Sequence, residues 1–150
     1  MIVFRLANEP YKNDISGDGA SRYGGRWNSS GLKVLYTSQS ISLTILESLV
    51  HLRSDLIPAS QHLLRIEVPD KDIIEISTVK IKPGWEREYE YTQWIGDQFI
   101  TQNQGLLLRV PSVIVPEEFN LLINPINKEF KKVKLLRSDL LRLDKRLRLL

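Results

Sequence analysis

One acidic residue stands inside an apolar segment of the sequence. Glu47 is the only carboxylate within residues 41–52. The spacing predicts a helix that is capped by Ser38 or Ser40 and ends at about Arg53. Apolar residues surround Glu47 on that helix, so we expect the helix to be buried nearly all round. A buried carboxylate is costly unless a cation or hydrogen-bond donors satisfy it, so Glu47 belongs either to a structural ion pair or to a chemical site.

A glycine-rich stretch presents one arginine between aromatic residues. Residues 23–28 read YGGRWN, and the two glycines free the backbone beside Arg26. A guanidinium held in this way suits bidentate binding of a phosphate or carboxylate. The alternative is a structural arginine that stacks on Trp27 and pairs with an acid. Gly17 and Gly19 have the spacing of the first two glycines of the dinucleotide-binding fingerprint, but Arg22 stands where the third glycine belongs. The phosphate-loop pattern is absent from the sequence.

Tyr36 lies on a predicted strand that leads into the Glu47 helix. Residues 33–37 are β-branched and aromatic enough for a strand, and their alternation places Tyr36 and Val34 on one face. If the helix folds back on this strand, Tyr36 and Glu47 face one cleft. The alternative is a tyrosine of the core.

Other polar residues are weaker candidates. Ser112 and Asn124 follow predicted strands, where polar residues are common in turns. No nucleophile elbow or Ser/His/Asp chain order indicates a serine hydrolase. His51 is one helical turn from Glu47 and could pair with it, but two ligands do not make a metal site, so we expect no metal.

The elements around these residues predict an α+β domain. Strand patterns occur at residues 2–7, 62–68, 73–77, 106–111, 119–123 and 132–136, and a second helix is predicted over residues 86–103. The connection over residues 8–32 has too few apolar residues for a helix or strand, and a loop of that length is usually functional. We therefore expect two or three helices on mostly antiparallel strands.

Composition indicates one ordinary globular domain. The chain has 150 residues, a net charge of +3 and a mean hydropathy of −0.20. The absence of cysteine excludes disulfide scaffolds, Cys-ligated zinc and thiol nucleophiles. With no signal-peptide pattern and no apolar run of about 18 residues, we expect a cytoplasmic protein without membrane contact.

Positive charge gathers in the last part of the chain. Residues 128–150 carry nine basic and three acidic side chains, a net +6 against −3 for residues 1–127. Such a segment can contact nucleic acid, an acidic partner or only water. Alternating Leu and Arg over residues 140–148 predict an edge strand with one buried face.

Several short motifs occur together in one order. They are FRL at 4–6, GGRWNSSG at 24–31, VLYTS at 34–38, SL at 42–43, LESLVH at 46–51, RVPS at 109–112, NLLINP at 120–125 and LDKRL at 143–147. In this combination the chain resembles the RES domain family, the toxin half of bacterial RES–Xre toxin–antitoxin systems. The resemblance covers essentially the whole chain, so we expect residues 1–150 to form a single RES domain.

The resemblance implies a fold, a substrate and a set of site residues. The fold is ADP-ribosyltransferase-like: a split, mainly antiparallel β-sheet with flanking helices and a cleft for NAD. NAD is implied as the substrate, and no metal is implied. Carried over by position, the catalytic residues are Glu47, Arg26 and Tyr36. The implied NAD-binding residues are Arg5, Arg26, Tyr36, Ser112 and Asn124.

The chemistry of NAD cleavage agrees with these residue types. Breaking the nicotinamide–ribose bond leaves positive charge on the sugar, as in the transition state of glycosidases. A carboxylate such as Glu47, aimed at that charge, stabilises the transition state more than the ground state. Arg26 and Arg5 can neutralise the pyrophosphate or orient the ribose, and Tyr36 can lie against the cationic nicotinamide ring.

Four hypotheses follow. The first is a toxin that consumes NAD as a glycohydrolase or phosphorylase, and the second is a protein ADP-ribosyltransferase toxin whose acceptor protein the sequence does not name. A nucleic-acid-acting toxin that uses the basic segment, or a non-catalytic binding module, are the alternatives from other classes. The resemblance implies a cognate Xre-type antitoxin that blocks the active site and supplies any contact with nucleic acid. A homodimer within the toxin–antitoxin complex also stays open.

Overall fold

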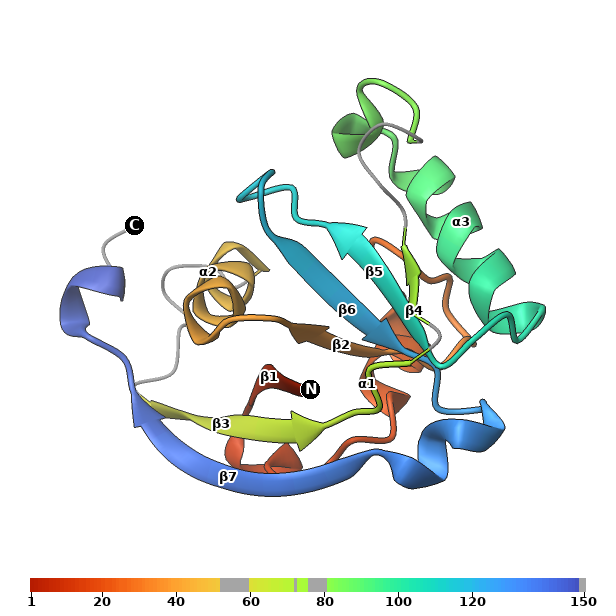
Figure 1. Cartoon of the computed structure of the whole chain (residues 1–150). Coiled ribbons are helices and arrows are strands. Elements are labelled where there is room, and N and C mark those ends of the chain that lie inside the picture. The colour runs from red at the N-terminus through yellow and green to blue at the C-terminus, as the bar shows by residue number, and fades with distance from the viewer. Residues whose placement is uncertain (52–59, 72, 76–80, 149–150) are drawn as a thin grey trace.

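A computed structural model describes residues 1–51, 60–71, 73–75 and 81–148 of the chain. In these residues seven strands and three α-helices alternate with short 3-10 turns (Figure 1). The strands are β1 (Ile2–Ala7), β2 (Leu35–Ser38), β3 (Ser60–Glu67), β4 (Ile73–Glu75), β5 (Leu107–Pro111), β6 (Phe119–Ile123) and β7 (Lys134–Arg142). The helices are α1 (Asp18–Tyr23), α2 (Ile41–His51) and α3 (Tyr89–Thr101).

The strands form one sheet that is split near its middle. Their order is β4-β5-β6-β2-β1-β3-β7, and every neighbouring pair is antiparallel except β4 and β5. β1 pairs with β3 from Ile2 to Ala7, but it pairs with β2 only where Phe4 lies opposite Ser38. The half-sheet β4-β5-β6-β2 therefore separates from the half-sheet β1-β3-β7. The expected α+β class and the split, mainly antiparallel sheet are confirmed.

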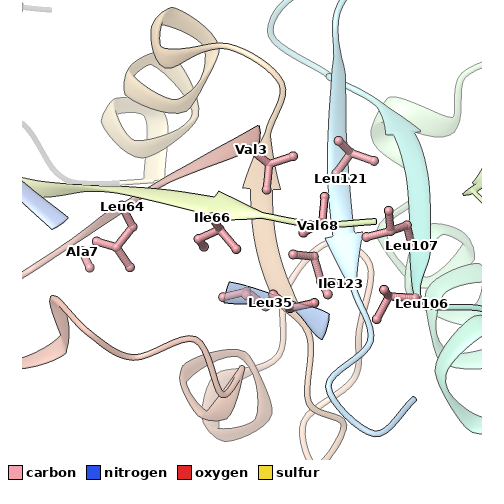
Figure 2. Packing of buried hydrophobic residues seen from close by; sticks show 11 residues of the cluster. Val3, Ala7, Leu35, Leu64, Ile66, Val68, Leu106, Leu107, Leu121 and Ile123 are labelled. Atoms are coloured by element: carbon pink, nitrogen blue, oxygen red, sulfur yellow. The ribbon is translucent and has the colours of Figure 1, made fainter. Parts of the chain in front are cut away.

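Two apolar clusters hold the halves and their helices together. The first lies between the half-sheets, and Figure 2 shows its side chains converging from both; they include Val3, Leu64, Ile66, Leu35, Leu107, Leu121 and Ile123. The second lies on the other face of β5 and β6 and packs them against α3; it includes Phe99, Ile100, Leu108, Leu122, Trp27 and Trp85. Neighbouring residues such as Leu121 and Leu122 belong to opposite clusters because side chains alternate along a strand. Strands buried on both faces explain the unbroken apolar runs in the sequence.

The strand and helix predictions hold with shifted ends, and three details are wrong. Residues 8–32 do contain a helix, α1, which buries no side chain and is instead held by hydrogen bonds from neighbouring loops. β7 is an edge strand, but it ends at Arg142, and a 3-10 turn follows over Lys145–Arg148 where the Asp144 carboxylate accepts from the Arg146 N–H. α2 is not buried all round: it packs on β1 and β2 from one side, and Val50 is 59% exposed. Arg53 and the end of the 73–77 prediction lie outside the described residues.

None of the helices in the described ranges is long and apolar enough to cross a membrane.

Candidate active site

A cavity of about 610 Å³ opens where the two half-sheets separate. Its walls come from β1, β2, α2, the loop over residues 24–27, the start of α3 and the ends of β5 and β6. Its size falls within the range of sites for small molecules and cofactors. Tyr36 and Glu47 both line it, as predicted for a helix that folds back on the preceding strand.

Glu47 is held by two side-chain donors from β6 and from the end of β5. Its Oε1 accepts a hydrogen bond from Ser112 Oγ at 2.8 Å and another from Asn120 Nδ2 at 2.5 Å. Ser112 follows β5, and Asn120 lies on β6, so two neighbouring strands converge on one oxygen of the α2 carboxylate.

Ser112 is fixed as a donor to Glu47 by its other contacts. The residue is 1% exposed, and its Oγ accepts hydrogen bonds from the backbone N–H groups of Ile114 and Val115 at 3.0 and 3.1 Å. A serine hydroxyl has one proton and two acceptor positions. The two backbone donors fill the acceptor positions, so the single proton points to the carboxylate. Ser112 is therefore a support for Glu47 and for the turn that follows β5, and it does not line the cavity itself.

Arg26 lines the mouth of the cavity with its guanidinium over the ring of Tyr89, 5.5 Å from the ring centroid. Its Nη1 also donates to the backbone oxygen of Glu86 at 3.0 Å. The alternative that placed Arg26 on Trp27 is wrong, because Trp27 is buried beside Trp85 with ring centroids 5.7 Å apart. Arg26 and Trp27 are the two central residues of a tight turn that the bridge between Gly25 and Asn28 closes, and Tyr89 of α3 meets Arg26 instead.

The loop that carries Arg26 is pinned to α3 through its backbone. Gln93 Nε2 donates to the carbonyls of Gly25 and Asn28 at 3.0 and 3.1 Å. The Asp97 carboxylate accepts from the N–H and the hydroxyl of Ser29 at 2.8 and 2.6 Å. One helix thus fixes the position of a loop that lies far from it in sequence.

Asn28 and Gly96 complete this attachment. Asn28 is fully buried, and its Nδ2 donates to three backbone carbonyls of the surrounding loop, those of Ala20, Ser29 and Leu32. Gly96 lets α3 approach the loop closely, since a Cβ there would lie 1.7 Å from the carbonyl oxygen of Trp27.

Tyr36 contributes a ring face to the cavity while its hydroxyl is used in the wall. The hydroxyl donates to Asn28 Oδ1 at 2.7 Å and accepts from the Trp27 N–H at 3.0 Å. Burial raises the pKa of the Tyr36 hydroxyl well above its usual value. The two hydrogen bonds of the hydroxyl hold the loop over residues 27–28 against β2.

Arg5 occupies the split itself. Its Nη1 donates to the Tyr36 carbonyl at 3.3 Å, across the gap where β1 and β2 no longer pair. Burial lowers the pKa of the Arg5 guanidinium, and the Asp14 carboxylate opposes that shift. The Nε of Arg5 is buried and has no hydrogen-bond partner among the residues that the structure describes. Arg5 thus places a second cationic group in the wall of the cavity.

Asn124 lies away from these residues. It is fully buried, its Nδ2 donates to Asn103 and to the Gly105 carbonyl, and its Oδ1 accepts from the Ile126 N–H. It closes the turn after β6 and is not among the residues that line the cavity. The side chain of His51 lies outside the described part of the chain. Within that part, no group of three or more His, Asp or Glu side chains is arranged to hold a metal.

The structure therefore brings Glu47, Arg26, Tyr36 and Arg5 to one cavity, with Ser112 behind Glu47. Sequence reasoning missed Asn120 and Tyr89. Asn120 carried a signal, because it is the one polar residue inside the apolar run that forms β6. Nothing in the sequence near Tyr89 indicated that α3 begins beside the Arg26 loop.

The sequence is similar to known proteins over most of its length. Residues 2–144 match the RES domain. The Prs ADP-ribosylating toxin of Sphingobium sp. (strain YBL2) is 43% identical over 127 residues, which cover 81% of this chain and 79% of that protein. Toxin Res of Pseudomonas putida (strain KT2440) is 38% identical over 141 residues, which cover 93% of this chain and 94% of that protein.

A solved structure shares the fold. One chain in the crystal structure of the M. tuberculosis MbcT–MbcA toxin–antitoxin complex superposes with a TM-score of 0.74, covering 94% of this chain and 84% of that chain. The two sequences are 19% identical, so this likeness concerns the fold alone.

Proposed function

The chain belongs to the RES domain family, and on that premise we propose that it is the toxin of a toxin–antitoxin pair and that it breaks the nicotinamide–ribose bond of NAD. Relatives at 43% and 38% identity carry toxin names. The observation that carries the proposal is a carboxylate, Glu47, held by two donors in a cavity that also contains two arginines and a tyrosine ring.

Glu47 stabilises the charge that develops on the sugar. Nicotinamide leaves as a neutral base, and its departure shifts positive charge from the ring nitrogen to the ribose. A fixed carboxylate next to the ribose interacts more strongly with that transition state than with the bound substrate. The hydrogen bonds from Ser112 and Asn120 hold the carboxylate in place, so little reorganisation is needed during the reaction.

The other cavity residues bind and orient the dinucleotide. Arg26 at the mouth and Arg5 in the split supply positive charge for the pyrophosphate, and the guanidinium fork suits two of its oxygens. The Tyr36 ring faces the cavity and can lie against the cationic nicotinamide. Because its hydroxyl is bonded to Asn28 and Trp27, Tyr36 acts through its ring and not as an acid or base.

The test mixes the purified protein with NAD, with and without inorganic phosphate, and separates the products by chromatography. We expect free nicotinamide from the wild type, and Glu47→Gln should lower its rate of formation by on the order of 10²–10³-fold. Circular dichroism and thermal unfolding of the variant establish that it is folded. A phosphate requirement identifies a phosphorylase, and its absence identifies a glycohydrolase. Unimpaired turnover by Glu47→Gln would contradict the proposal.

A second candidate is transfer of ADP-ribose to a protein. The relative named as a Prs ADP-ribosylating toxin, at 43% identity, favours it. The test incubates this chain with NAD and purified Prs and measures the intact mass of the acceptor. If NAD stays intact until Prs is added, and Prs then gains one ADP-ribose, transferase activity replaces NAD destruction. No reaction in either assay would favour the nucleic-acid or binding-module alternatives.

The cognate partner would be an Xre-type antitoxin that covers the cavity, and the complex would act in the cytoplasm. The structural neighbour comes from a toxin–antitoxin complex, which supports a partner of this kind. Adding the purified antitoxin to the NAD assay should stop nicotinamide release. An antitoxin that binds without inhibiting would show that it does not block this site.

A further inference from the structure

Two polar residues that also line the cavity, Ser38 and Asn120, form a chain of hydrogen bonds to Glu47. Ser38 at the end of β2 lies directly opposite Asn120 on β6. The Ser38 hydroxyl donates to Asn120 Oδ1 at 2.6 Å, and Asn120 Nδ2 donates to Glu47 Oε1 at 2.5 Å. The chain therefore runs from the Ser38 hydroxyl on β2, through the Asn120 amide on β6, to the Glu47 carboxylate on α2.

The direction of hydrogen-bond donation along this chain is fixed by which of its groups are donors and which are acceptors. An asparagine amide has a donor end and an acceptor end, and rotation by half a turn exchanges them. In the rotated form Asn120 Oδ1 would face the Glu47 carboxylate, and two acceptors would repel each other. The Ser38 proton, directed at Oδ1, holds the amide in the form that presents its NH₂ group to Glu47.

The location of Ser38 ties this chain to the opening of the cavity. Ser38 is 4% exposed and lies opposite Phe4 at the position where β1 still pairs with β2. The amide is thus anchored at the root of the split and not on a mobile surface. Ser112 supplies another donor to Glu47 from the end of β5, so loss of Asn120 removes one of the hydrogen bonds that fix the direction of the carboxylate.

We propose that Asn120 is a positioning residue for Glu47 and that Ser38 sets the orientation of the Asn120 amide. The proposal rests on the proposed function, in which Glu47 is the reacting carboxylate. Asn120 acts on the transition state through Glu47, so its loss should lower kcat and leave KM nearly unchanged.

The kinetic test compares Asn120→Leu, Ser38→Ala and Ser38→Thr in the NAD assay. We expect Asn120→Leu to lower kcat by about 10–100-fold with KM within about twofold, because small displacements of a reacting group cost rates of this size. Ser38→Ala should lower kcat by about fivefold, and Ser38→Thr, which keeps the hydroxyl, should recover it. Ser138→Ala is the matched control, since the Ser138 hydroxyl is buried without a hydrogen-bond partner. A change in KM with constant kcat would overturn the proposal.

A double substitution separates positioning from a general structural role. In the Glu47→Gln background, adding Asn120→Leu should lower the remaining rate by less than about twofold, because residues that act as a unit are not additive. A full additional loss in the double variant would show that Asn120 acts independently of Glu47 and would overturn the proposal.

A third measurement does not depend on the reaction. The side-chain amide resonances of Asn120, recorded by ¹⁵N–¹H NMR, should shift in Ser38→Ala and in Glu47→Gln and stay in place in Ser138→Ala. If wild type leaves NAD intact but these shifts occur, the proposed reaction fails and the hydrogen-bonded chain stands. If NAD is cleaved and the resonances do not respond, the positioning proposal fails alone.

Discussion

The two walls of the cavity are held together in different ways. On the carboxylate wall, formed by α2 and the ends of β5 and β6, side chains bond to the side chain of Glu47. On the arginine wall, formed by residues 24–28, side chains of α3 bond mainly to the loop backbone. In the described part of the chain, Arg26 itself contacts the Glu86 carbonyl and the Tyr89 ring. The first arrangement fixes one charged atom, and the second fixes a segment from which a long side chain reaches outward.

This difference predicts which quantity each wall controls. Loss of a donor to Glu47 releases the position of the reacting carboxylate and should affect kcat. Loss of an anchor on the arginine wall leaves backbone N–H and C=O groups without partners, which costs folding free energy. The largest effects on stability should therefore come from the arginine wall.

Gly96→Ala should give the largest loss of stability. The added Cβ would lie 1.7 Å from the Trp27 carbonyl oxygen, so α3 and the loop must separate. We expect a loss of about 3 kcal/mol in the free energy of unfolding, at the upper end for overpacked sites. Urea denaturation measures it. Gly19→Ala is the control: the site on α1 has no atom within 4 Å of the added Cβ, and alanine favours the helix there. Equal stability of the two variants would show that the loop does not depend on α3.

Tyr36→Phe should give the next largest loss. It removes a hydroxyl that donates to Asn28 and accepts from the Trp27 N–H, and leaves both groups unsatisfied inside the wall. We expect a loss of about 2 kcal/mol in the free energy of unfolding. NAD cleavage should survive, since the ring remains in the cavity. Tyr91→Phe is the control, because the Tyr91 hydroxyl makes only an exposed contact, 3.4 Å from the Lys82 N–H. Loss of all activity in a folded Tyr36→Phe would assign the phenol to proton transfer and contradict its role in the wall.

The same contrast explains what the sequence could predict. Hydrophobic periodicity and turn residues are local signals that act over a few positions. They predicted α2, the strands and the cavity residues on α2 and β2. They did not predict the attachment of the Arg26 loop to α3, in which Asp97 meets Ser29 across 68 positions of sequence. α1 was missed because it buries no apolar face, and periodicity detects only helices that do.

The residues of the candidate site were also predictable only where the signal was local. Glu47 was identifiable because a carboxylate in an apolar helix needs partners, but those partners, Ser112 and Asn120, come from strands that are distant in sequence. Asn124 has the same residue type as Asn120 and follows the same strand, yet it closes a turn outside the cavity. Residue type and proximity in sequence do not separate these two asparagines, and only the pairing of β6 with β2 does.

Ser112→Ala should lower both the free energy of unfolding and kcat, with a smaller loss of stability than the two substitutions above. Its hydroxyl serves Glu47 and also accepts from the N–H groups of Ile114 and Val115. We expect a loss of about 1.5 kcal/mol in the free energy of unfolding together with a lower kcat. Ser138→Ala removes a buried hydroxyl that has no partner and should change stability by less than about 0.5 kcal/mol. Equal effects of the two substitutions would show that burial, and not the hydrogen bonds to Ser112, sets the cost.

Arg26→Lys should have the smallest effect on stability and should act on binding. Lysine keeps the positive charge but loses the planar fork and the stacking over Tyr89. Since the side chain extends from a loop anchored through its backbone, the free energy of unfolding should change by less than about 0.5 kcal/mol. We expect KM for NAD to rise about tenfold, which corresponds to about 1.4 kcal/mol, while kcat falls less. Arg87→Lys is the control, because Arg87 is exposed and lies just before α3. If Arg26→Lys instead lowers kcat at constant KM, the arginine belongs with Glu47 in stabilising the transition state, and the division of roles between the two walls is wrong.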